Sequence, residues 1–458
     1  MTVRSSAPIA VIAVMGLLAL CAEAGAQAPA PDPLSSRAPW RDAVMGGPLA
    51  PPTVTADGPL LVVVSTAADL SHPEFAGANL TNLADGPLTS PDGTAAASIA
   101  AAPANGHGIL GIWPGMHVAV SPVPRPDGLG CEEVAKALER ALEADPAVIV
   151  IGYGFDASAG RAGDACVSHF TAVQEAVRRG VIVVASGPLN RSDGTATGDP
   201  ATLPHVLSVA ATTADGLPAE FTRESVTTDL AAPGVSIFAA VPPAFDQNGD
   251  GYRGQNGTAY AAPMVGAAAA WLLAARPALR ADQVAAVLRR SARDLDAPGF
   301  DDLTGWGMLN LAGALAQPAA RGDAREPNED IRWIDGKLLD RPQPALRRGG
   351  DALFARLDRY EDPADVYRLR LPPRSRERVR LRVVDGDPSL ALYDVRARSV
   401  REQRHRLARS DRRGRGTETL LARNPGRRTR TLFVRVVLSP DADGDAAAYR
   451  LTTAPVAR

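Results

Sequence analysis

One acidic loop in this sequence has residue types and spacing that suit metal chemistry. It reads Asp-Gln-Asn-Gly-Asp-Gly from Asp246 to Gly251, so Asp246, Asn248 and Asp250 offer oxygen atoms at alternate positions before a glycine turn. The first half of a calcium loop has this spacing, because a hard cation is surrounded there by carboxylate and amide oxygens. No bidentate glutamate follows at the twelfth position, so a plain polar loop is the alternative. We expect no cofactor unless this loop holds a structural calcium ion, since no His, Cys and carboxylate cluster has the spacing of a zinc site.

The N-terminal segment predicts export. Residues 1–26 have one early cation at Arg4, then an apolar stretch, then the small-residue triplet Ala24-Gly25-Ala26, which is the pattern of a cleavable secretory signal. A lipid anchor on Cys21 is the alternative, although the large Leu20 before it is atypical of such sites. We therefore expect a secreted, extracellular protein.

Export leaves two cysteines in an oxidising compartment. We expect Cys131 and Cys166 to form a disulfide rather than to remain free thiols. No apolar stretch after the signal approaches the roughly 20 residues that a membrane span requires, so no membrane span is expected.

The composition is that of a globular protein, with 45% hydrophobic and 22% charged residues and a net charge of −2. Well over half of the 49 Lys and Arg residues lie after Arg321. Nearly all of these cations are arginines, and together with the many Ala, Gly and Pro residues we interpret this as a mark of a GC-rich genome and predict no nucleic-acid partner. The Arg-rich stretch from Arg396 to Arg430 suits an anionic surface polymer or an acidic partner, with a solvated loop face as the alternative.

Two hydrophobic patterns divide the chain. Short β-branched runs such as Leu60 to Val64 and Val148 to Ile151 alternate with helix-period stretches, which is typical of an α/β doubly wound parallel sheet. After residue 328 the pattern changes to strict alternation, as in Val366 to Leu371, which predicts a small antiparallel β-sandwich. The expected organisation is a signal peptide at 1–26, an α/β domain at 32–318, a linker at 319–328 and a sandwich at 329–458.

The segment Gly257-Thr258-Ala259-Tyr260-Ala261-Ala262-Pro263-Met264-Val265 resembles the nucleophile segment of the subtilisin-like serine proteases, the subtilases, which usually reads Gly-Thr-Ser-Met-Ala-Ala-Pro-His-Val. In that family a serine hydroxyl stands at the start of a long buried helix. Ala259 occupies the serine position, and an alanine has no lone pair with which to attack. Tyr260 replaces a residue that points away from the chemistry in the family.

The other two positions of the triad also differ from the family. The segment Val62-Val63-Val64-Ser65 is similar to the strand Val-Ile-Asp, so the resemblance implies that Ser65 replaces the aspartate that orients the catalytic imidazole. The family pattern His-Gly-Thr-His-Val-Ala-Gly-Ile, aligned on the Gly-Ile of Gly111-Ile112, places Asn105 at the catalytic histidine. His107 lies two residues further on, and two helical positions turn a side chain by about 200°, so we do not expect it at the active site.

Further matches extend the resemblance over roughly residues 32–316. The segment Gly180 to Gly187 resembles the strand that leads to the oxyanion asparagine, which makes Asn190 the candidate donor if the loop is displaced. The residues Glu326-Pro327-Asn328-Glu329 open a region that looks like the pre-peptidase C-terminal β-sandwich of secreted proteases, an accessory module.

The leading hypothesis is a non-catalytic extracellular protein that keeps the subtilase fold and binds a peptide or protein partner. An active subtilisin-like serine endopeptidase is the alternative that family membership alone would suggest. A third hypothesis is a relic domain that acts as a spacer for the C-terminal module.

Overall fold

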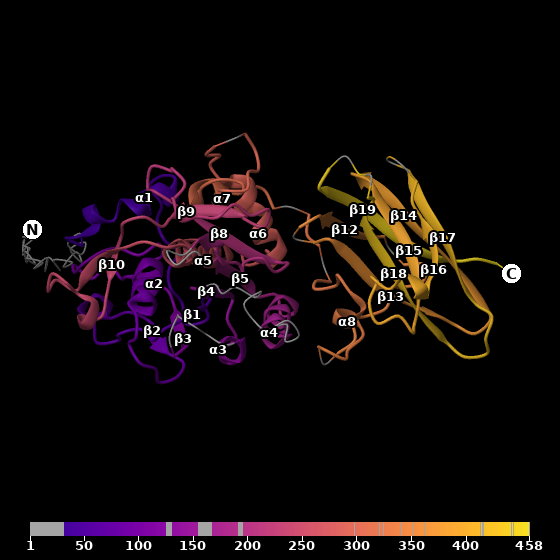
Figure 1. Cartoon of the computed structure of the whole chain (residues 1–458), viewed down its shortest axis with the longest axis horizontal. Helices are drawn as coiled ribbons and strands as arrows, with labels where there is room; N and C mark the ends of the chain where they lie inside the picture. Colours follow the sequence, from indigo (N-terminus) through magenta and orange to yellow (C-terminus); the bar gives the residue numbers. More distant parts are fainter. Residues whose placement is uncertain are drawn as a thin grey trace, which may run out of the picture.

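The computed structural model describes residues 32–124, 131–153, 167–190 and 196–457, apart from single positions at 297, 320, 324, 340, 351, 361, 413, 415, 441 and 443. Its elements form two bodies: an α/β body that ends with α7 (Leu311–Ala316) and a β body that begins with α8 (Ile331–Ile334) and has β12 (Leu353–Asp358) as its first strand (Figure 1). The predicted signal peptide lies outside the described residues.

A seven-stranded parallel sheet forms the centre of the α/β body, in the order β2-β3-β1-β4-β5-β8-β9. Strand β1 is placed between β3 and β4, so the chain winds outward from it in both directions. In such sheets the carboxyl ends of the strands at this switch point form the usual site. The doubly wound fold predicted from the strand runs is confirmed. The strands are β1 (Leu61–Ser65), β2 (Leu80–Asn82), β3 (Val118–Pro122), β4 (Val148–Ile151), β5 (Ile182–Ser186), β8 (Val206–Thr212) and β9 (Leu230–Pro233).

Helices cover both faces of this sheet. On one face α2 (Asp92–Ala101) and α5 (Thr258–Ala275) share a core with Leu61 and Val63 of β1. On the other face α3 (Cys131–Glu143) and α4 (Val167–Arg178) share a second core with Val62 and Val64. Because alternate side chains of a strand point to opposite faces, a strand covered on both faces needs a continuous apolar run.

The helix α5 is apolar all round because it is the core helix of the α/β body. Among the described residues it is the one helix long and apolar enough to cross a membrane, but 78% of that stretch is buried inside the protein. The remaining elements of this body are η1 (Ser35–Arg37), α1 (Pro39–Met45), η2 (Pro73–Phe75), β6 (Leu189–Asn190), β7 (Ala196–Thr197), β10 (Ile237–Ala240), η4 (Pro243–Phe245), β11 (Tyr252–Gln255) and α6 (Ala281–Ser291).

The β body contains two four-stranded antiparallel sheets, in the orders β12-β19-β14-β17 and β13-β18-β15-β16. Both sheets contribute to one apolar core, so they face each other as a sandwich. The antiparallel C-terminal region predicted from the alternating pattern is thus present. Its further elements are α8 (Ile331–Ile334), β13 (Ala364–Leu371), β14 (Ser375–Asp385), β15 (Pro388–Asp394), η5 (Gln403–His405), β16 (Arg406–Ser410), β17 (Thr417–Asn424), β18 (Arg430–Leu438) and β19 (Ala446–Pro455).

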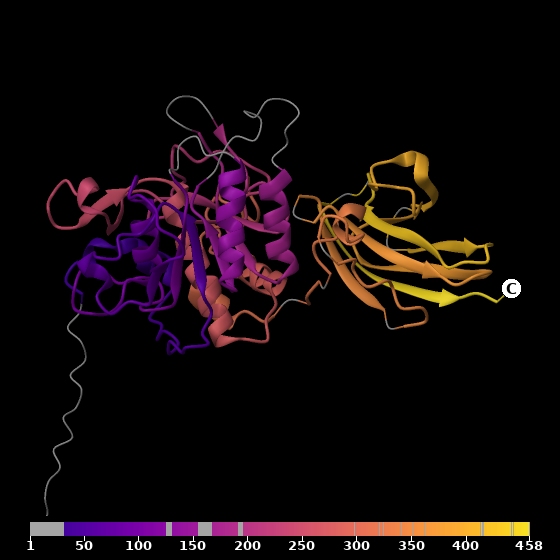
Figure 2. The ribbon, with the colours of Figure 1, turned by 90° about the horizontal axis from the view of Figure 1, so that it is seen from below.

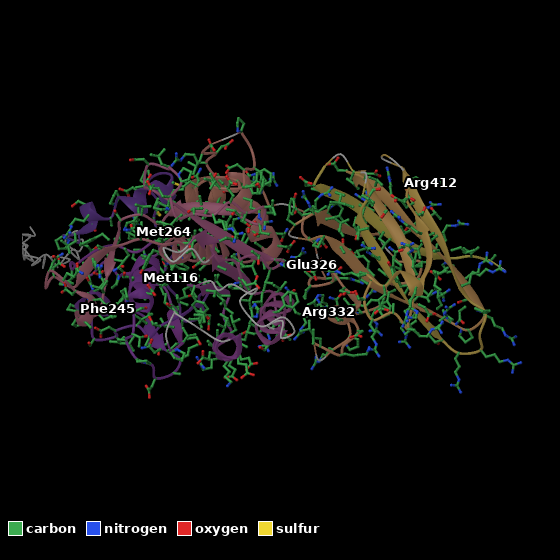
Figure 3. The ribbon with its side chains drawn as sticks, viewed as in Figure 1. Met116, Phe245, Met264, Glu326, Arg332 and Arg412 are labelled. Atoms are coloured by element: carbon green, nitrogen blue, oxygen red, sulfur yellow. The ribbon has the colours of Figure 1, made fainter. Side chains whose placement is uncertain are left out.

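Side chains from α4 and α8 join the two bodies. The rings of Phe170 and Trp333 lie 4.9 Å apart between centroids, and the guanidinium of Arg332 lies 5.7 Å from the Phe170 ring. Figure 2 shows α3 and α4 on the side of the α/β body that is nearest the sandwich, and in Figure 3 Glu326 and Arg332 lie between the two bodies.

Candidate functional site

The helix α5 begins with the segment that resembles a nucleophile motif. Thr258 is fully buried, and its hydroxyl donates to the carbonyl of Gly187 at 3.2 Å, so this hydroxyl holds the start of the helix in place. Ala259 follows and is only partly buried. A Cβ atom on Gly266 would lie 2.2 Å from Cγ2 of Val150, so a glycine is what lets α5 approach β4 so closely. The methyl group of Ala259 therefore lies at the start of a helix that packs tightly against the sheet.

A hydrogen-bonded cluster surrounds this helix start. The Tyr260 hydroxyl donates to Oδ1 of Asp92 at 2.5 Å and lies 3.4 Å from Oε1 of Gln255. The Ser90 hydroxyl donates to Oδ2 of Asp92 at 2.8 Å and contacts the Thr66 hydroxyl at 3.0 Å. Burial and the Asp92 carboxylate raise the pKa of Tyr260, which keeps the phenol protonated at neutral pH. We call these five residues, Thr66, Ser90, Asp92, Gln255 and Tyr260, the Asp92 cluster.

Ser65 ends β1 at the same edge of the sheet. It is buried, and the next residue, Thr66, belongs to the Asp92 cluster. A Cβ atom on Gly152, which follows the neighbouring strand β4, would lie 3.6 Å from Oγ of Ser65. The ends of β1, β4, α2 and α5 therefore meet at the switch point of the sheet, and they place Ser65 and Ala259 on this one edge.

Asn105 does not lie at this edge. It is exposed in the loop that follows the C-terminal end of α2, where its Nδ2 donates to the carbonyl of Glu74 at 3.0 Å and to that of Ala76 at 3.2 Å. Asp32 accepts from the backbone N–H of Gly106 in the same loop at 2.9 Å. Burial raises the pKa of the neighbouring Glu74 to about 7. Asn105 thus connects a surface loop to the backbone of η2.

None of the chain's six histidines joins the Asp92 cluster, and all six lie within the described residues. The cluster therefore contains no imidazole that could take a proton from a hydroxyl at position 259. The histidines are His72 beside Gly251, His107 beside Tyr252, His117 beside Thr55, His169 in α4, His205 beside Glu329 and His405 beside Glu402.

Comparison with known proteins shows which family the α/β body matches. Residues 84–307 match the model of the family described as the subtilase family. The matched segment contains both α2 and α5, and hence Asp92 and Ala259. The α/β body is a subtilase domain.

The individual proteins that this chain resembles include subtilisins and an enzyme related to them. Subtilisin E of Bacillus subtilis (strain 168) is 29% identical over 262 residues, which are 56% of this chain and 65% of the relative. Fervidolysin of Fervidobacterium pennivorans is 28% identical over 298 residues, 57% of this chain and 41% of the relative. Its crystal structure, described as that of a keratinolytic enzyme related to subtilisin, covers 85% of this chain and 70% of that chain with a TM-score of 0.56 and 19% identity, which shows a shared fold.

The structure of the subtilase domain changes which residue aligns with the catalytic histidine of the family. The residues Asp92-Gly93-Thr94 share the Gly-Thr pair of the family pattern His-Gly-Thr and begin a helix of small residues. A Cβ atom on Gly93 would lie 2.0 Å from the carbonyl oxygen of Thr66, so this glycine lets α2 touch the end of β1. Asp92 contacts Tyr260, the residue after Ala259, whereas Asn105 lies beyond the other end of α2, so the structure contradicts the placement of Asn105 beside Ala259 and favours Asp92. The shared Gly-Thr pair was the signal that could have revealed it.

Tyr260 also differs from expectation. Its side chain is turned toward Asp92 rather than away from the site, because the carboxylate offers an acceptor for the buried phenol. Three other candidate residues, Asn190, Cys131 and Cys166, have side chains outside the described part of the chain. The backbone of Asn190 lies in the short strand β6 of the subtilase domain, paired with Ala196, but the placement of its side chain is not described. The Cys131 side chain and Cys166 are likewise outside, so their disulfide stays a prediction.

The acidic loop of the subtilase domain turns its carboxylates toward its own backbone. Asp246 accepts from the backbone N–H groups of Asn248, Gly249 and Gly251 at 2.8–3.0 Å, and these hydrogen bonds lower its pKa. Asp250 accepts from Tyr252 at 3.0 Å. The backbone donors account for the loop's shape without a cation, and calcium at this place stays a prediction.

Proposed function

We propose that this protein is a secreted, non-catalytic member of the subtilase family that binds a peptide or protein partner through the groove of its subtilase domain or the surfaces around it. The observation that carries the proposal is the methyl group of Ala259 at the start of α5, where the family has its serine hydroxyl. In subtilisin, loss of the nucleophile costs about 10⁶ in kcat.

The hydroxyls near Ala259 are poor substitutes for the missing serine. Thr258 is buried and bonded to a carbonyl, and Tyr260 has a raised pKa and donates to Asp92. Attack on a peptide also needs a base that takes the proton of the hydroxyl, and the Asp92 cluster contains no imidazole. Among the described residues around Ala259, the nucleophile and the base that a serine protease mechanism needs are therefore both missing.

An active serine endopeptidase is the alternative. It is favoured by the relatives, which are named subtilisins, and by one contact, in which Ser90 donates to the carboxylate of Asp92 at 2.8 Å. Such a hydroxyl and carboxylate pair would have to act without an imidazole. Ser90 is buried, so a substrate carbonyl would have little access to it. A relic domain that acts as a spacer for the β body is a third possibility.

The remaining parts of the proposal rest on the sequence. Residues 1–26 support secretion, and Cys131 and Cys166 support a disulfide in the exported chain. An anionic polymer is proposed as a further partner of the Arg-rich stretch. Part of that charge is neutralised locally, since Arg396 and Arg430 both pair with Asp394.

The proposal predicts that the purified chain binds unfolded casein without cutting it. We expect intact casein after a day at 37 °C by mass spectrometry, while subtilisin under the same conditions degrades it. Asp92→Asn and Tyr260→Phe variants are matched controls, because each removes a group that an unorthodox mechanism would need. Cleavage by the native chain that disappears in either variant would contradict the proposal; cleavage equal in all three would come from a contaminant.

A further inference from the structure

A pocket of about 350 Å³ lies against the β13-β18-β15-β16 sheet of the β body, whose strands run side by side in Figure 1. Four arginines line it: Arg359 after β12, Arg406 and Arg409 on β16, and Arg435 on β18. Among the described residues, no aspartate or glutamate lines this pocket. We call it the arginine pocket.

The pairing of the strands places the arginine side chains on the outer face of the sheet. Val434 and Val436 belong to the core between the two sheets, so Arg435, which lies between them in sequence, points to the opposite face. Arg435 is paired with Ala391 of β15, and Ala391 is paired with Arg409 of β16. Because directly paired residues share a face, Arg409 and Arg435 flank Ala391 on the outer face.

A β-bulge brings a second arginine of β16 to the same face. The register shifts between Leu392 and Tyr393 of β15, and beyond the shift Tyr393 is paired with Arg406. Tyr393 and Ala391 both belong to the apolar cluster on the outer face. Arg406 and Arg409 are three residues apart, so in a regular strand they would point to opposite faces, and the bulge is what lets both point outward.

Two of the four arginines have no anionic partner. Arg406 and Arg435 form no ion pair with any described residue, and the buried Nε of Arg435 has no hydrogen-bond partner there. Arg359 and Arg409 each pair with one aspartate, but their side chains are 39–40% exposed, so water screens these pairs. A buried guanidinium N–H without an acceptor costs free energy, so the pocket suits an anionic ligand.

The neutral part of the lining suits a sugar ring. Ser389 lies two residues before Ala391 on β15 and therefore points to the same face; it is 3% exposed, and no described residue is a partner of its hydroxyl. Gln403 of η5 adds an amide, and Val437 adds an apolar wall. The volume falls in the range of about 300–1,000 Å³ that is typical of small-molecule pockets, so there is room for a ring beside the charged group.

We propose that the arginine pocket binds one acidic sugar of a uronate-containing polysaccharide. The guanidinium groups of Arg406 and Arg435 hold the carboxylate, because the planar fork of an arginine matches the two oxygens of such a group. The amide and hydroxyl of the lining meet the hydroxyls of the ring, which the side chains of an acidic peptide lack. This inference rests on the anionic partner proposed above for the Arg-rich stretch, and it names the site and the chemical class.

The loop before β16 extends the site along a polymer. Arg398, Arg401 and Arg404 are exposed, and none of them pairs with a described carboxylate. They lie just before or beside Gln403, a residue of the pocket lining. A polymer with one charge on each sugar can contact these arginines in succession, so longer chains should bind more tightly than short ones.

Binding is tested by calorimetric titration of the full-length chain with tetragalacturonate. We expect one ligand per chain and an affinity that falls as salt is added, because exposed charges are screened. Maltotetraose, a neutral sugar chain of the same length, should not bind. Tetraglutamate, which has the carboxylates without the sugar hydroxyls, should bind more weakly than tetragalacturonate.

Variants of the pocket separate it from the rest of the charged surface. Arg435→Gln should weaken tetragalacturonate at least about tenfold, because a charge-assisted hydrogen bond is lost. Arg435→Lys keeps the charge without the fork and should recover only part of the affinity. Arg406→Gln, on the edge strand β16, should also weaken binding and gives a second measurement if Arg435→Gln fails to fold. The control Arg380→Gln removes an exposed arginine of β14 in the other sheet and should leave the affinity unchanged.

Three results would overturn the assignment. Tighter binding of tetraglutamate than of tetragalacturonate would assign the pocket to an acidic peptide. Equal losses in Arg435→Gln and Arg380→Gln would show an unspecific attraction to the charged surface. Native affinity in both Arg435→Gln and Arg406→Gln would leave the anionic partner of the Arg-rich stretch in place but outside the pocket, whereas no binding by the native chain would contradict that partner as well.

Discussion

A chain that carries Ser65→Asp, Asp92→His and Ala259→Ser is expected to gain weak peptidase activity. The three positions come from β1, α2 and α5, whose ends meet at one edge of the sheet, and the glycine at 93 already lets α2 touch β1. New side chains there should lie in reach of one another, as a serine, an imidazole and a carboxylate must. We therefore expect hydrolysis of a chromogenic peptide above background.

The peptidase activity of this triple variant should stay well below that of an ordinary subtilase. Pro188 and Leu189 lie where the oxyanion asparagine is expected, and removal of one oxyanion donor costs about 10²–10³ in kcat. The Tyr260 hydroxyl, which now donates to residue 92, would compete for the new imidazole. Adding Tyr260→Phe should for this reason raise the rate further.

The matched control is the triple variant with Asn105→His in place of Asp92→His. Asn105 lies beyond the far end of the ten-residue helix α2, which is about 15 Å long, so an imidazole there is separated from position 92 by the length of the helix. This variant should stay at background. Equal activity of the two triple variants would contradict the assignment of Asp92, and a full subtilase rate in the first would show that the oxyanion site is intact.

Arg289→Met is expected to destabilise the subtilase domain by about 3–5 kcal/mol, because removal of one partner of a buried ion pair leaves the other charge unpaired. Arg289 of α6 pairs with Asp229, whose side chain is 3% exposed and also accepts from the backbone N–H of Ser208 at 2.7 Å. The measurement is urea unfolding followed by tryptophan fluorescence, since Trp40, Trp113 and Trp271 all lie in the core of this domain.

The control for this prediction is Lys337→Met. Lys337 pairs with Asp335 at 2.8 Å, but its side chain is 79% exposed, and an exposed pair contributes about 1 kcal/mol or less. A loss of stability for Arg289→Met no larger than that of the control would contradict the buried-pair account.

The loss of stability caused by Arg289→Met should also depend on pH. Burial raises the pKa of Asp229, and Arg289 is the strongest influence that opposes this rise. Without Arg289 the folded-state pKa rises further, so the penalty is fully present when Asp229 is charged and shrinks as the pH falls and the carboxyl becomes protonated. The difference in the free energy of unfolding between the variant and the native protein should therefore become smaller from pH 7 toward pH 4.5.

The fold could be predicted because its signals are local. A run such as Val62-Val63-Val64 is buried on both faces and can hardly belong to anything but a covered parallel strand, and the small residues after Ala259 are required wherever a helix packs closely on a sheet. Alternation in β14 likewise follows from a sheet with one buried face.

The positions of single site residues were harder to predict, because they depend on the register of an alignment. The Gly-Ile pair that follows α2 points to Asn105, although the Gly-Thr pair at the start of α2 is where this helix meets β1. Asp323, Glu326, Asp362 and Asp365 have oxygen atoms within 4.8 Å of one another, and the sequence has no signal for this grouping. The first two lie on a linker and the other two lie just before and within β13, so only the fold of the β body brings them together.

Labelling of the native chain with a fluorophosphonate probe tests the central claim most directly. The probe forms a covalent bond with an activated serine, and Ala259 has no oxygen with which to react. Intact-mass spectrometry of the protein, beside subtilisin as a positive control, should show complete labelling of subtilisin and none of this chain. Stoichiometric labelling of any residue in the subtilase domain would contradict the account, because it would reveal an activated nucleophile that replaces the missing serine.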